Sequence, residues 1–182
     1  EELSKVDASA SVMVSVNNSL VCWGLETYGT EAQKEKYLTR LASGEIIGAF
    51  CLSEPEAGSD ATSQKTTAID KGDHYVLNGT KNWITNGNRA EVYLVIAQTH
   101  VEKGHHGINA LIVEKGMEGF EIGPKENKLG IRGSDTHSLL FNDVKVPKEN
   151  RIGEDGFGFK FAMKTLAGGR IGIAAQALGI AA

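Results

Sequence analysis

Residues 74–85 read HYVLNGTKNWIT, two runs rich in aromatic and β-branched residues on either side of Asn78-Gly79. Runs of this composition, broken by turn dipeptides, are typical of β-strands. An Asn-Gly dipeptide between two such runs is a strong signal for a tight turn, so we predict a β-hairpin here. The stretch therefore indicates a region built from antiparallel strand pairs.

Five further runs of the same kind surround this stretch, and each predicts a strand. They are IGAFCLS (47–53), SQKTTAID (63–70), EVYLVIAQ (91–98), INALIVEK (108–115) and HSLLFNDVKVP (137–147). The third and fourth are almost continuously apolar, which predicts central strands. A tight turn is expected at residues 71–73, and Pro124 and Pro147 are expected at edges or turns, where a missing N–H is harmless. Because no long helix interrupts these strands, we expect an antiparallel barrel or sandwich, not a doubly wound sheet.

Helical patterns precede and follow the strands. Thr30 lies three residues before Gln33, a capping-box pattern that predicts a helix ending near Gly44. Before it, apolar residues three or four apart predict a helix that ends at Gly29. These residues are Leu3, Val6, Met13, Val16, Leu20 and Trp23.

The last part of the chain is again helical in pattern, with an apolar stripe of Phe159, Ala162, Met163 and Leu166. Glycine weakens a helix, so Gly168-Gly169 predicts either an interruption or a close approach of the helix backbone to a neighbouring group. We therefore predict an α+β chain with helical residues 1–45, a β domain over 46–155 and one helix over 156–182. Both ends fall inside helical patterns, so we expect a piece of a longer protein with uncovered apolar faces such as Phe159, Met163 and Leu166.

The composition is that of a soluble globular protein, with 41% apolar and 23% charged residues. A net charge of −4 argues against a nucleic-acid partner, and no apolar run approaches the length of a membrane span. Cys22 and Cys51 stand alone among apolar neighbours, which predicts buried, reduced thiols. The histidines lack the spacing of zinc ligands, so we expect no metal.

The stretch CLSEPEAGSD, residues 51–60, follows an expected strand and offers hydroxyl groups and a flexible glycine. Ser53, Gly58 and Ser59 could cradle a polar or anionic ligand, and the alternative is a solvated turn. Glu54 and Glu56 would share one face of an extended segment, but no buried or basic neighbour that would tune a paired-carboxylate site is visible.

Two other stretches offer ligand-binding groups. Trp83 and Thr85 are two residues apart and would share a strand face, where a ring and a hydroxyl suit a planar heteroaromatic ligand. The alternative places Trp83 in the core. Arg170 could pair with a phosphate, and the alternative is a solvated arginine on a helix.

Taken in order, FCLSEPEAGSDA, YVLNGTKNWITNG, NKLGIRGSDTHSLLFNDVKVP and GEDGFGFKFAMKTLAGGRIGIAAQALGIA resemble the acyl-CoA dehydrogenases, above all the short-chain, butyryl-CoA type. The resemblance implies the end of an N-terminal helical domain, a whole middle β domain and the first helix of a C-terminal helical domain. It also implies bound FAD and α,β-dehydrogenation of acyl-CoA thioesters, with electrons passed to an electron-transfer flavoprotein. It further implies a homotetramer in the bacterial cytoplasm or, in a eukaryote, the mitochondrial matrix.

The same resemblance assigns site residues. The expected FAD-binding residues are Phe50, Cys51, Leu52, Ser53, Glu54, Gly58, Ser59, Trp83, Ile84 and Thr85. The expected residues near CoA are Ser59, Ala167, Gly168, Gly169 and Arg170. The family often has Asp where this chain has Ala167, so a hydrogen bond from that position cannot form.

The family's catalytic glutamate lies far downstream in the short-chain type, and none of Glu54, Glu56, Glu114, Glu118 or Glu121 matches it. We therefore expect residues 1–182 alone neither to turn over substrate nor to hold FAD tightly. Other readings are an acyl-CoA oxidase, a flavin monooxygenase relative or a non-catalytic β binding module.

Overall fold

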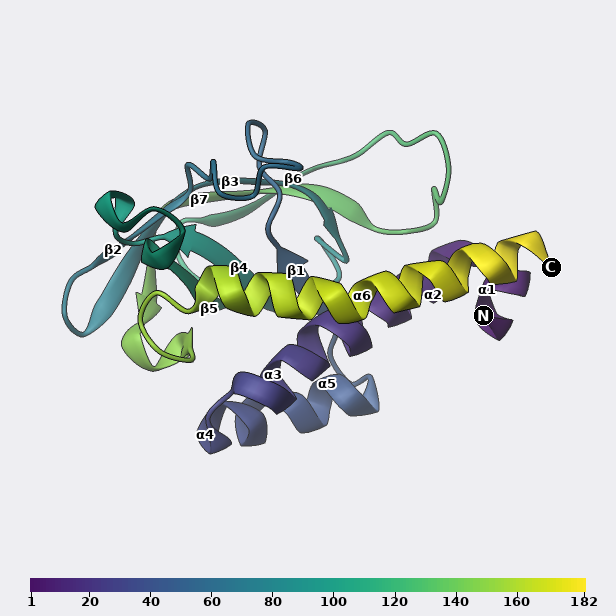
Figure 1. Ribbon diagram of the computed structural model, residues 1–182, viewed down its shortest axis with the longest axis horizontal. Coiled ribbons are helices and arrows are strands. Elements are labelled where there is room, and N and C mark those ends of the chain that lie inside the picture. The colour runs from purple at the N-terminus through teal and green to yellow at the C-terminus, as the bar shows by residue number, and fades with distance from the viewer.

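A twisted sheet lies against a layer of helices in the computed structural model, which describes residues 1–182 (Figure 1). The strands are β1 (Gly48–Cys51), β2 (Thr67–Asp70), β3 (His74–Thr85), β4 (Val92–Gln98), β5 (Ile108–Glu114), β6 (Phe120–Lys125), β7 (Thr136–Pro147) and β8 (Arg151–Ile152). The α-helices are α1 (Glu2–Val6), α2 (Ala8–Ser15), α3 (Trp23–Tyr28), α4 (Glu31–Gln33), α5 (Thr39–Ser43) and α6 (Gly158–Ala181). Two π-helical segments, Val16–Cys22 and Lys34–Leu38, join α2 to α3 and α4 to α5. Short 3-10 turns cover Val101–Gly107 and Lys148–Asn150.

The sheet has the strand order β6-β7-β3-β2-β4-β5-β8, with β1 paired to β4. The α+β class and a largely antiparallel sheet flanked by helices are confirmed, and the sheet is open rather than closed into a barrel. Two pairings are parallel: β1 runs beside β4 from Gly48–Val92 to Cys51–Val95, and β2 touches β4 at Thr67–Gln98. Pro124 lies in the edge strand β6 and Pro147 ends β7, as expected.

Strand β4 separates two apolar cores, because successive side chains of a strand point to opposite faces. Tyr93, Val95 and Ala97 belong to a core formed with β3 and β7. The alternate residues Val92, Leu94 and Ile96 belong to a core shared with the helices. The prediction that 91–98 is a central strand is therefore confirmed, with both faces buried.

The predicted hairpin at Asn78-Gly79 is wrong, because β3 runs through both residues and pairs with β7 on either side of them. The turn of the hairpin lies earlier, at residues 71–73, where the Lys71 N–H donates to the His74 carbonyl across 2.9 Å. Gly79 has φ +140°, and a Cβ there would stand 2.7 Å from the Cα of Thr66. The glycine thus permits a close approach of two backbones inside a strand.

The first helical region forms as predicted and ends at Gly29, but Asp7 divides it. Asp7 has an extended backbone, and its carboxylate accepts the N–H groups of Ser9 and Ala10, so it caps α2. The predicted apolar face is wrong in this part, because Leu3 and Val6 are 55% and 91% exposed. Small and polar residues form much of the buried side instead, namely Ser4, Ser11, Asn17 and Gly24. Val21 and Leu25 are the fully buried apolar residues.

The capping box at Thr30 and Gln33 is confirmed, since each side chain accepts from the other residue's backbone N–H. Gly44 ends α5 in the left-handed conformation, also as predicted. Cys51 is buried as expected, and burial raises the pKa of its thiol, whereas Cys22 is half-buried.

Helix α6 crosses Gly168-Gly169 without interruption and runs alongside α1 and α2 (Figure 1). A Cβ at Gly169 would stand 2.7 Å from Leu20, so the close-approach alternative holds at this position. Phe159, Met163 and Leu166 are half-buried against the helical core, contrary to the expected exposure. The exposed apolar residues of α6 lie further along, at Ile171, Ile173, Leu178 and Ile180.

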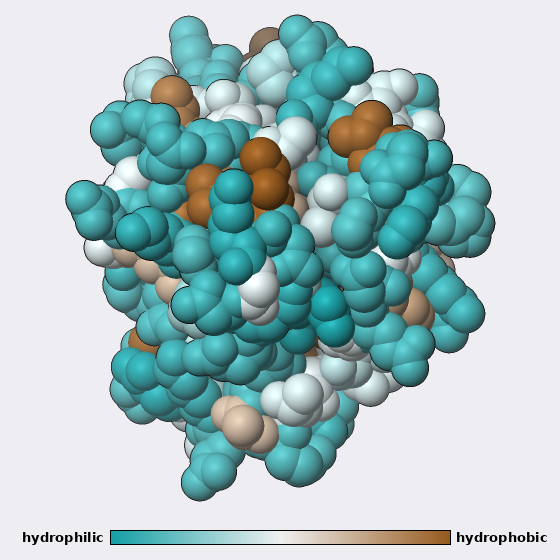
Figure 2. All heavy atoms as spheres, turned by 90° about the vertical axis from the view of Figure 1, so that its left-hand side faces the viewer, coloured by the Kyte–Doolittle hydropathy of each residue, from teal (hydrophilic) through white to brown (hydrophobic).

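The opposite end of the molecule, near β2 and the 3-10 turn Val101–Gly107, is mainly hydrophilic with small separate apolar patches (Figure 2). Ile69 and Val101 are exposed apolar residues of these elements. No helix combines the length and the apolar character needed to cross a membrane.

Candidate functional site

The loop after β1 lies against the second half of β3. The backbone N–H of Asn82 donates to the carbonyl of Ser53 across 2.8 Å. One residue earlier, Lys81 Nζ donates to the carbonyl of Leu52 across 3.0 Å. The fold thus brings Ser53 beside Trp83, although 30 positions separate them in the sequence.

Trp83 sits in a β-bulge. Lys81 pairs with Leu139 and Ile84 with His137, so β3 carries one more residue than β7 over this interval. Trp83 has φ +60°, and its side chain is 59% exposed, while the neighbouring Ile84 is buried. The alternative that places Trp83 in the core is therefore wrong. A left-handed backbone at a bulky residue stores strain of about 1–3 kcal/mol, which is common at ligand sites.

The loop bonded to Asn82 and the end of β3 offer groups that can hydrogen-bond the polar edge of a ligand. Ser53 and Thr85 are both half-buried, and Gly58 and Ser59 are exposed. No backbone hydrogen bond within the chain uses the N–H of Ser53. A Cβ at Gly58 would meet no atom within 4 Å, so this part of the loop is open. An exposed aromatic plane with hydroxyl groups and a free N–H nearby fits a planar heteroaromatic group such as the flavin ring of FAD.

The two glutamates of the loop do not form a carboxylate pair. Glu54 and Ala57 exchange two backbone hydrogen bonds, with N–O distances of 3.0 and 3.2 Å, so the loop closes into a tight turn. Glu56 is exposed at its tip, while Glu54 is buried.

Glu54 forms a buried ion pair with Lys81 at 2.7 Å, and these side chains are 2% and 0% exposed. The Glu54 carboxylate also accepts the backbone N–H groups of Lys65 at 2.6 Å and Thr66 at 3.2 Å. Burial disfavours its ionised form, but the charge and hydrogen bond of Lys81 and these N–H groups outweigh it and lower the pKa of Glu54. The Glu54 carboxylate is thus fully used in holding the loop and is not available as a catalytic base.

Lys81 is not among the residues predicted from the sequence, yet its position carries a signal. Tyr75 and Leu77 are fully buried, and Lys81 continues their alternation along β3. A lysine on the buried face of a strand requires a buried partner, because an unpaired charge in the protein interior is costly. The partner itself lies 27 positions away and was not recognisable from spacing.

Asp135 holds the segment that follows Thr85. Its carboxylate accepts the backbone N–H groups of Asn88 and Arg89, each at 2.8 Å, and contacts Nε2 of His137 at 3.0 Å. Burial opposes ionisation of Asp135, but these hydrogen bonds and the His137 charge outweigh it and lower its pKa. Asp135 is likewise not among the residues predicted from the sequence.

The residues expected near CoA lie on α6. Gly169 and Arg170 line a mostly apolar hollow of about 280 Å³ between α6 and the helix that contains Ser15, Val16 and Leu20. Ala167 is exposed and Gly168 is half-buried, and neither lines this hollow. Ser59, expected on the same ligand, does not line it either, so the fold does not join these residues into one pocket.

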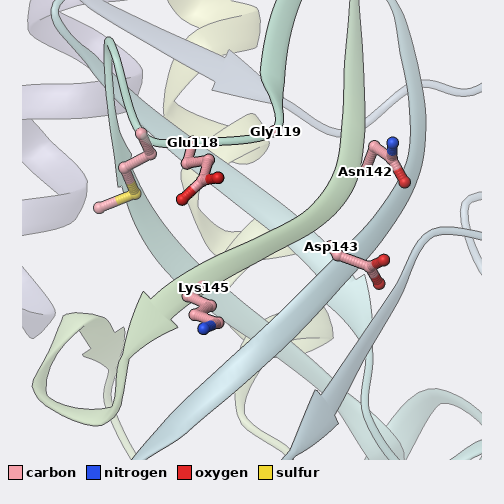
Figure 3. A pocket seen from close by; sticks show the side chains of 6 residues that line it. Glu118, Gly119, Asn142, Asp143 and Lys145 are labelled. Atoms are coloured by element: carbon pink, nitrogen blue, oxygen red, sulfur yellow. The ribbon is translucent and has the colours of Figure 1, made fainter.

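A second hollow of about 550 Å³ lies between the turn before β6 and strand β7 (Figure 3). Its lining is mostly polar and consists of Met117, Glu118, Gly119, Asn142, Asp143 and Lys145. None of the expected cofactor or substrate residues lines it, so it is separate from the candidate site.

Two protein-family models match the chain. The model described as "Acyl-CoA dehydrogenase, middle domain" matches residues 49–144, more than half of the chain. The model described as "Acyl-CoA dehydrogenase, N-terminal domain" matches residues 1–45. The chain belongs to the acyl-CoA dehydrogenase family, whose members are FAD-dependent oxidoreductases.

Within the family, the chain is similar to short-chain members. It is 56% identical to a short-chain specific acyl-CoA dehydrogenase of Clostridium acetobutylicum, over 100% of this chain and 48% of that protein. It therefore spans about half the length of the curated relatives it matches.

Solved structures of acyl-CoA dehydrogenases are also similar to this chain. Butyryl-CoA dehydrogenase of Megasphaera elsdenii has a TM-score of 0.97 at 54% identity, over 99% of this chain and 47% of that one. A chain in a structure of the electron transferring flavoprotein of Acidaminococcus fermentans has a TM-score of 0.97 at 55% identity, over 98% and 47%. An acyl-CoA dehydrogenase of Bacillus anthracis complexed with FAD has a TM-score of 0.77 at 45% identity, over 84% and 26%.

Proposed function

We propose that this chain is part of an acyl-CoA dehydrogenase that oxidises the Cα–Cβ bond of short-chain acyl-CoA thioesters. The observation that carries the proposal is the junction of Ser53 and Asn82, which sets the polar loop after β1 beside the exposed ring of Trp83. FAD, when bound, supplies the acceptor for the hydride that leaves Cβ. The short-chain description of the relatives supports the substrate class.

The cofactor would be held by the two stretches that meet at this junction. Trp83 offers an exposed ring for packing, and Ser53 and Thr85 offer hydroxyl groups for the polar edge of a flavin. Ile84 and Cys51 are buried and anchor these residues in the sheet. Arg170, on α6, would contact the CoA part of the substrate, where its guanidinium can pair with phosphate.

The base that removes the α-proton is proposed to lie outside residues 1–182. Glu54 cannot serve, because its carboxylate is buried and bonded to Lys81 and two backbone N–H groups. Glu114 is bonded to Lys36 and Tyr37, and Glu118 lines the separate hollow at β7. We therefore propose that residues 1–182 alone neither turn over substrate nor hold FAD tightly.

Within the longer protein, residues 1–45 would end an N-terminal helical domain, 46–155 would form the middle β domain and 156–182 would begin a C-terminal helical domain. Electrons would pass to an electron-transfer flavoprotein, and the protein would assemble as a homo-oligomer, as the resemblance implies. It would work in the cytoplasm of a bacterium or the matrix of a mitochondrion, consistent with relatives of both origins.

The test uses the full-length protein that contains residues 1–182. We expect a yellow preparation whose flavin absorption bleaches on addition of butyryl-CoA, less readily with palmitoyl-CoA, and is restored by an electron-transfer flavoprotein. A colourless protein without FAD affinity would favour a non-catalytic binding module. Rapid reoxidation by oxygen would favour an acyl-CoA oxidase or a flavin monooxygenase.

A second assay tests the isolated segment. Residues 1–182, mixed with butyryl-CoA, FAD and a dye acceptor, should show no turnover above the rate without protein. Appreciable turnover would place a base within this segment and contradict the assignment outside it.

A further inference from the structure

The ammonium group of Lys81 has three hydrogen-bond acceptors and no exposure to solvent. They are the Leu52 carbonyl at 3.0 Å, Oε1 of Glu54 at 2.7 Å and Oε1 of Gln64 at 3.0 Å. A lysine ammonium has three donors, so all of them are used. Because each acceptor belongs to the loop between β1 and β2, Lys81 fixes that loop to β3 from within.

The bond to Leu52 also sets the direction of the next amide group. The chain has no cis peptide bonds, and in a planar trans peptide the carbonyl oxygen and the amide hydrogen point to opposite sides. With the Leu52 carbonyl turned toward Lys81, the N–H of Ser53 points away from Lys81. The carbonyl of Ser53 is held by Asn82, and the N–H of Glu54 donates to Ala57. These two groups belong to the Ser53–Glu54 peptide, so the peptide that follows is fixed as well.

The N–H of Ser53 is thus oriented but has no backbone partner within the chain. It lies in the loop that the junction with Asn82 sets next to Trp83. An N–H group held in one direction without a partner is suited to donate to an acceptor atom of a ligand. On the polar edge of a flavin, such acceptors are the ring nitrogens and carbonyl oxygens.

We infer that Lys81 is a positioning residue for the flavin, which acts by holding the Leu52 carbonyl so that the Ser53 N–H faces the ring. This inference rests on the proposed function, because it requires FAD at the Ser53–Trp83 junction. Lys81 itself does not contact the cofactor. Its buried pairing with Glu54 keeps the ammonium in place, and the bulge that exposes Trp83 begins at the residue after it.

The experiment compares variants of the full-length flavoprotein. Lys81→Met removes the donor, and Lys81→Met/Glu54→Gln removes both charges while keeping an amide acceptor for Lys65 and Thr66. Lys36→Met, which breaks the exposed Lys36–Glu114 pair, is the matched control. The measurements are the Kd for FAD, the visible absorption spectrum and the reduction potential of the bound flavin, and urea unfolding of the flavin-free protein.

The double variant should fold in the flavin-free state, since removing both members of a buried ion pair leaves no unpaired charge. Both Lys81 variants should nevertheless raise the Kd for FAD by about tenfold, as expected for one well-oriented hydrogen bond, and shift the flavin spectrum and potential. Lys36→Met should leave all three at the parental values.

Two results would overturn the inference. The first is a double variant that folds and binds FAD with the parental Kd, spectrum and potential. The second is a double variant that does not fold, because Lys81 would then have a purely structural role. A parent protein that binds no FAD would instead refute the proposed function and, with it, the positioning role.

Discussion

The backbone N–H of Asn82 donates to the carbonyl of Ser53 across 2.8 Å and joins the loop after β1 to the bulged part of β3. Asn82 stands directly before Trp83, a residue that is 59% exposed. This main-chain hydrogen bond therefore joins the two stretches that we propose hold the flavin.

Replacing Trp83 should change the free energy of unfolding and the affinity for FAD in opposite directions. Trp83→Gly removes a bulky residue from φ +60°, so the flavin-free protein should gain about 1 kcal/mol in the free energy of unfolding. The same variant should bind FAD more weakly, because the packing ring is lost. Trp83→Phe, the control, keeps an aromatic ring at the strained position and should gain no stability. Urea unfolding and FAD titration of the full-length protein measure both effects, and an unchanged FAD affinity in Trp83→Gly would count against the site.

Asp135→Asn should destabilise the protein by about 1–3 kcal/mol, because the anionic acceptor for two backbone N–H groups is lost. The folded state lowers the pKa of Asp135, so its contribution is complete above the unfolded pKa of about 3.9 and is lost as the pH falls through the folded value. The difference between parent and variant in urea unfolding should therefore be largest near neutral pH and shrink below about pH 4.

The control for this prediction is Glu154→Gln, which alters an exposed carboxylate and should change stability little at any pH. A difference between the parent and Asp135→Asn that stays constant down to pH 3 would show that the Asp135 charge does not hold the segment after Thr85.

Gly79→Ala should destabilise the protein by about 3 kcal/mol, since the added Cβ combines a strained φ with a clash against the Thr66 backbone. Gly72→Ala is the matched control, because Gly72 also has a positive φ but nothing within 4 Å of its Cβ position. That variant should lose only about 1 kcal/mol. Urea unfolding compares the two, and equal losses would argue that β3 and Thr66 do not approach as closely as described.

Arg170→Ala should raise the KM of the full-length enzyme for butyryl-CoA by about tenfold with little change in kcat, as expected when a ground-state contact to phosphate is lost. Ala167→Asp should lower KM, because the carboxylate would supply a hydrogen bond that Ala167 cannot form. Lys164→Ala, an exposed cation of α6 that does not line the hollow near Arg170, should leave KM unchanged. Steady-state kinetics with butyryl-CoA measure both constants. A lower kcat with an unchanged KM in Arg170→Ala would contradict the proposed contact between Arg170 and CoA.

The local parts of the fold were predictable because they depend on neighbours in the sequence. The capping box at Thr30 and Gln33 and the stop at Gly44 are local hydrogen-bond and backbone effects, and both were recognised. The continuous apolar run at 91–98 likewise identified the central strand. A strong local signal failed where tertiary pairing opposed it: Asn78-Gly79 reads as a turn, but the pairing of β3 with β7 keeps the strand extended.

The local sequence was enough to predict the helical and β regions, the turn at residues 71–73 and, through the order of its motifs, the family. The tertiary structure alone decided which side chains meet: Lys81 with Glu54, Asp135 with the backbone after Thr85, and Ser53 with Asn82. It also decided that Trp83 faces solvent, because a bulge changes the alternation of β3 at that residue. The period of a strand indicates which face each of its residues occupies. Contacts with distant segments form only in the folded protein, because a buried charge or N–H group without a partner is costly.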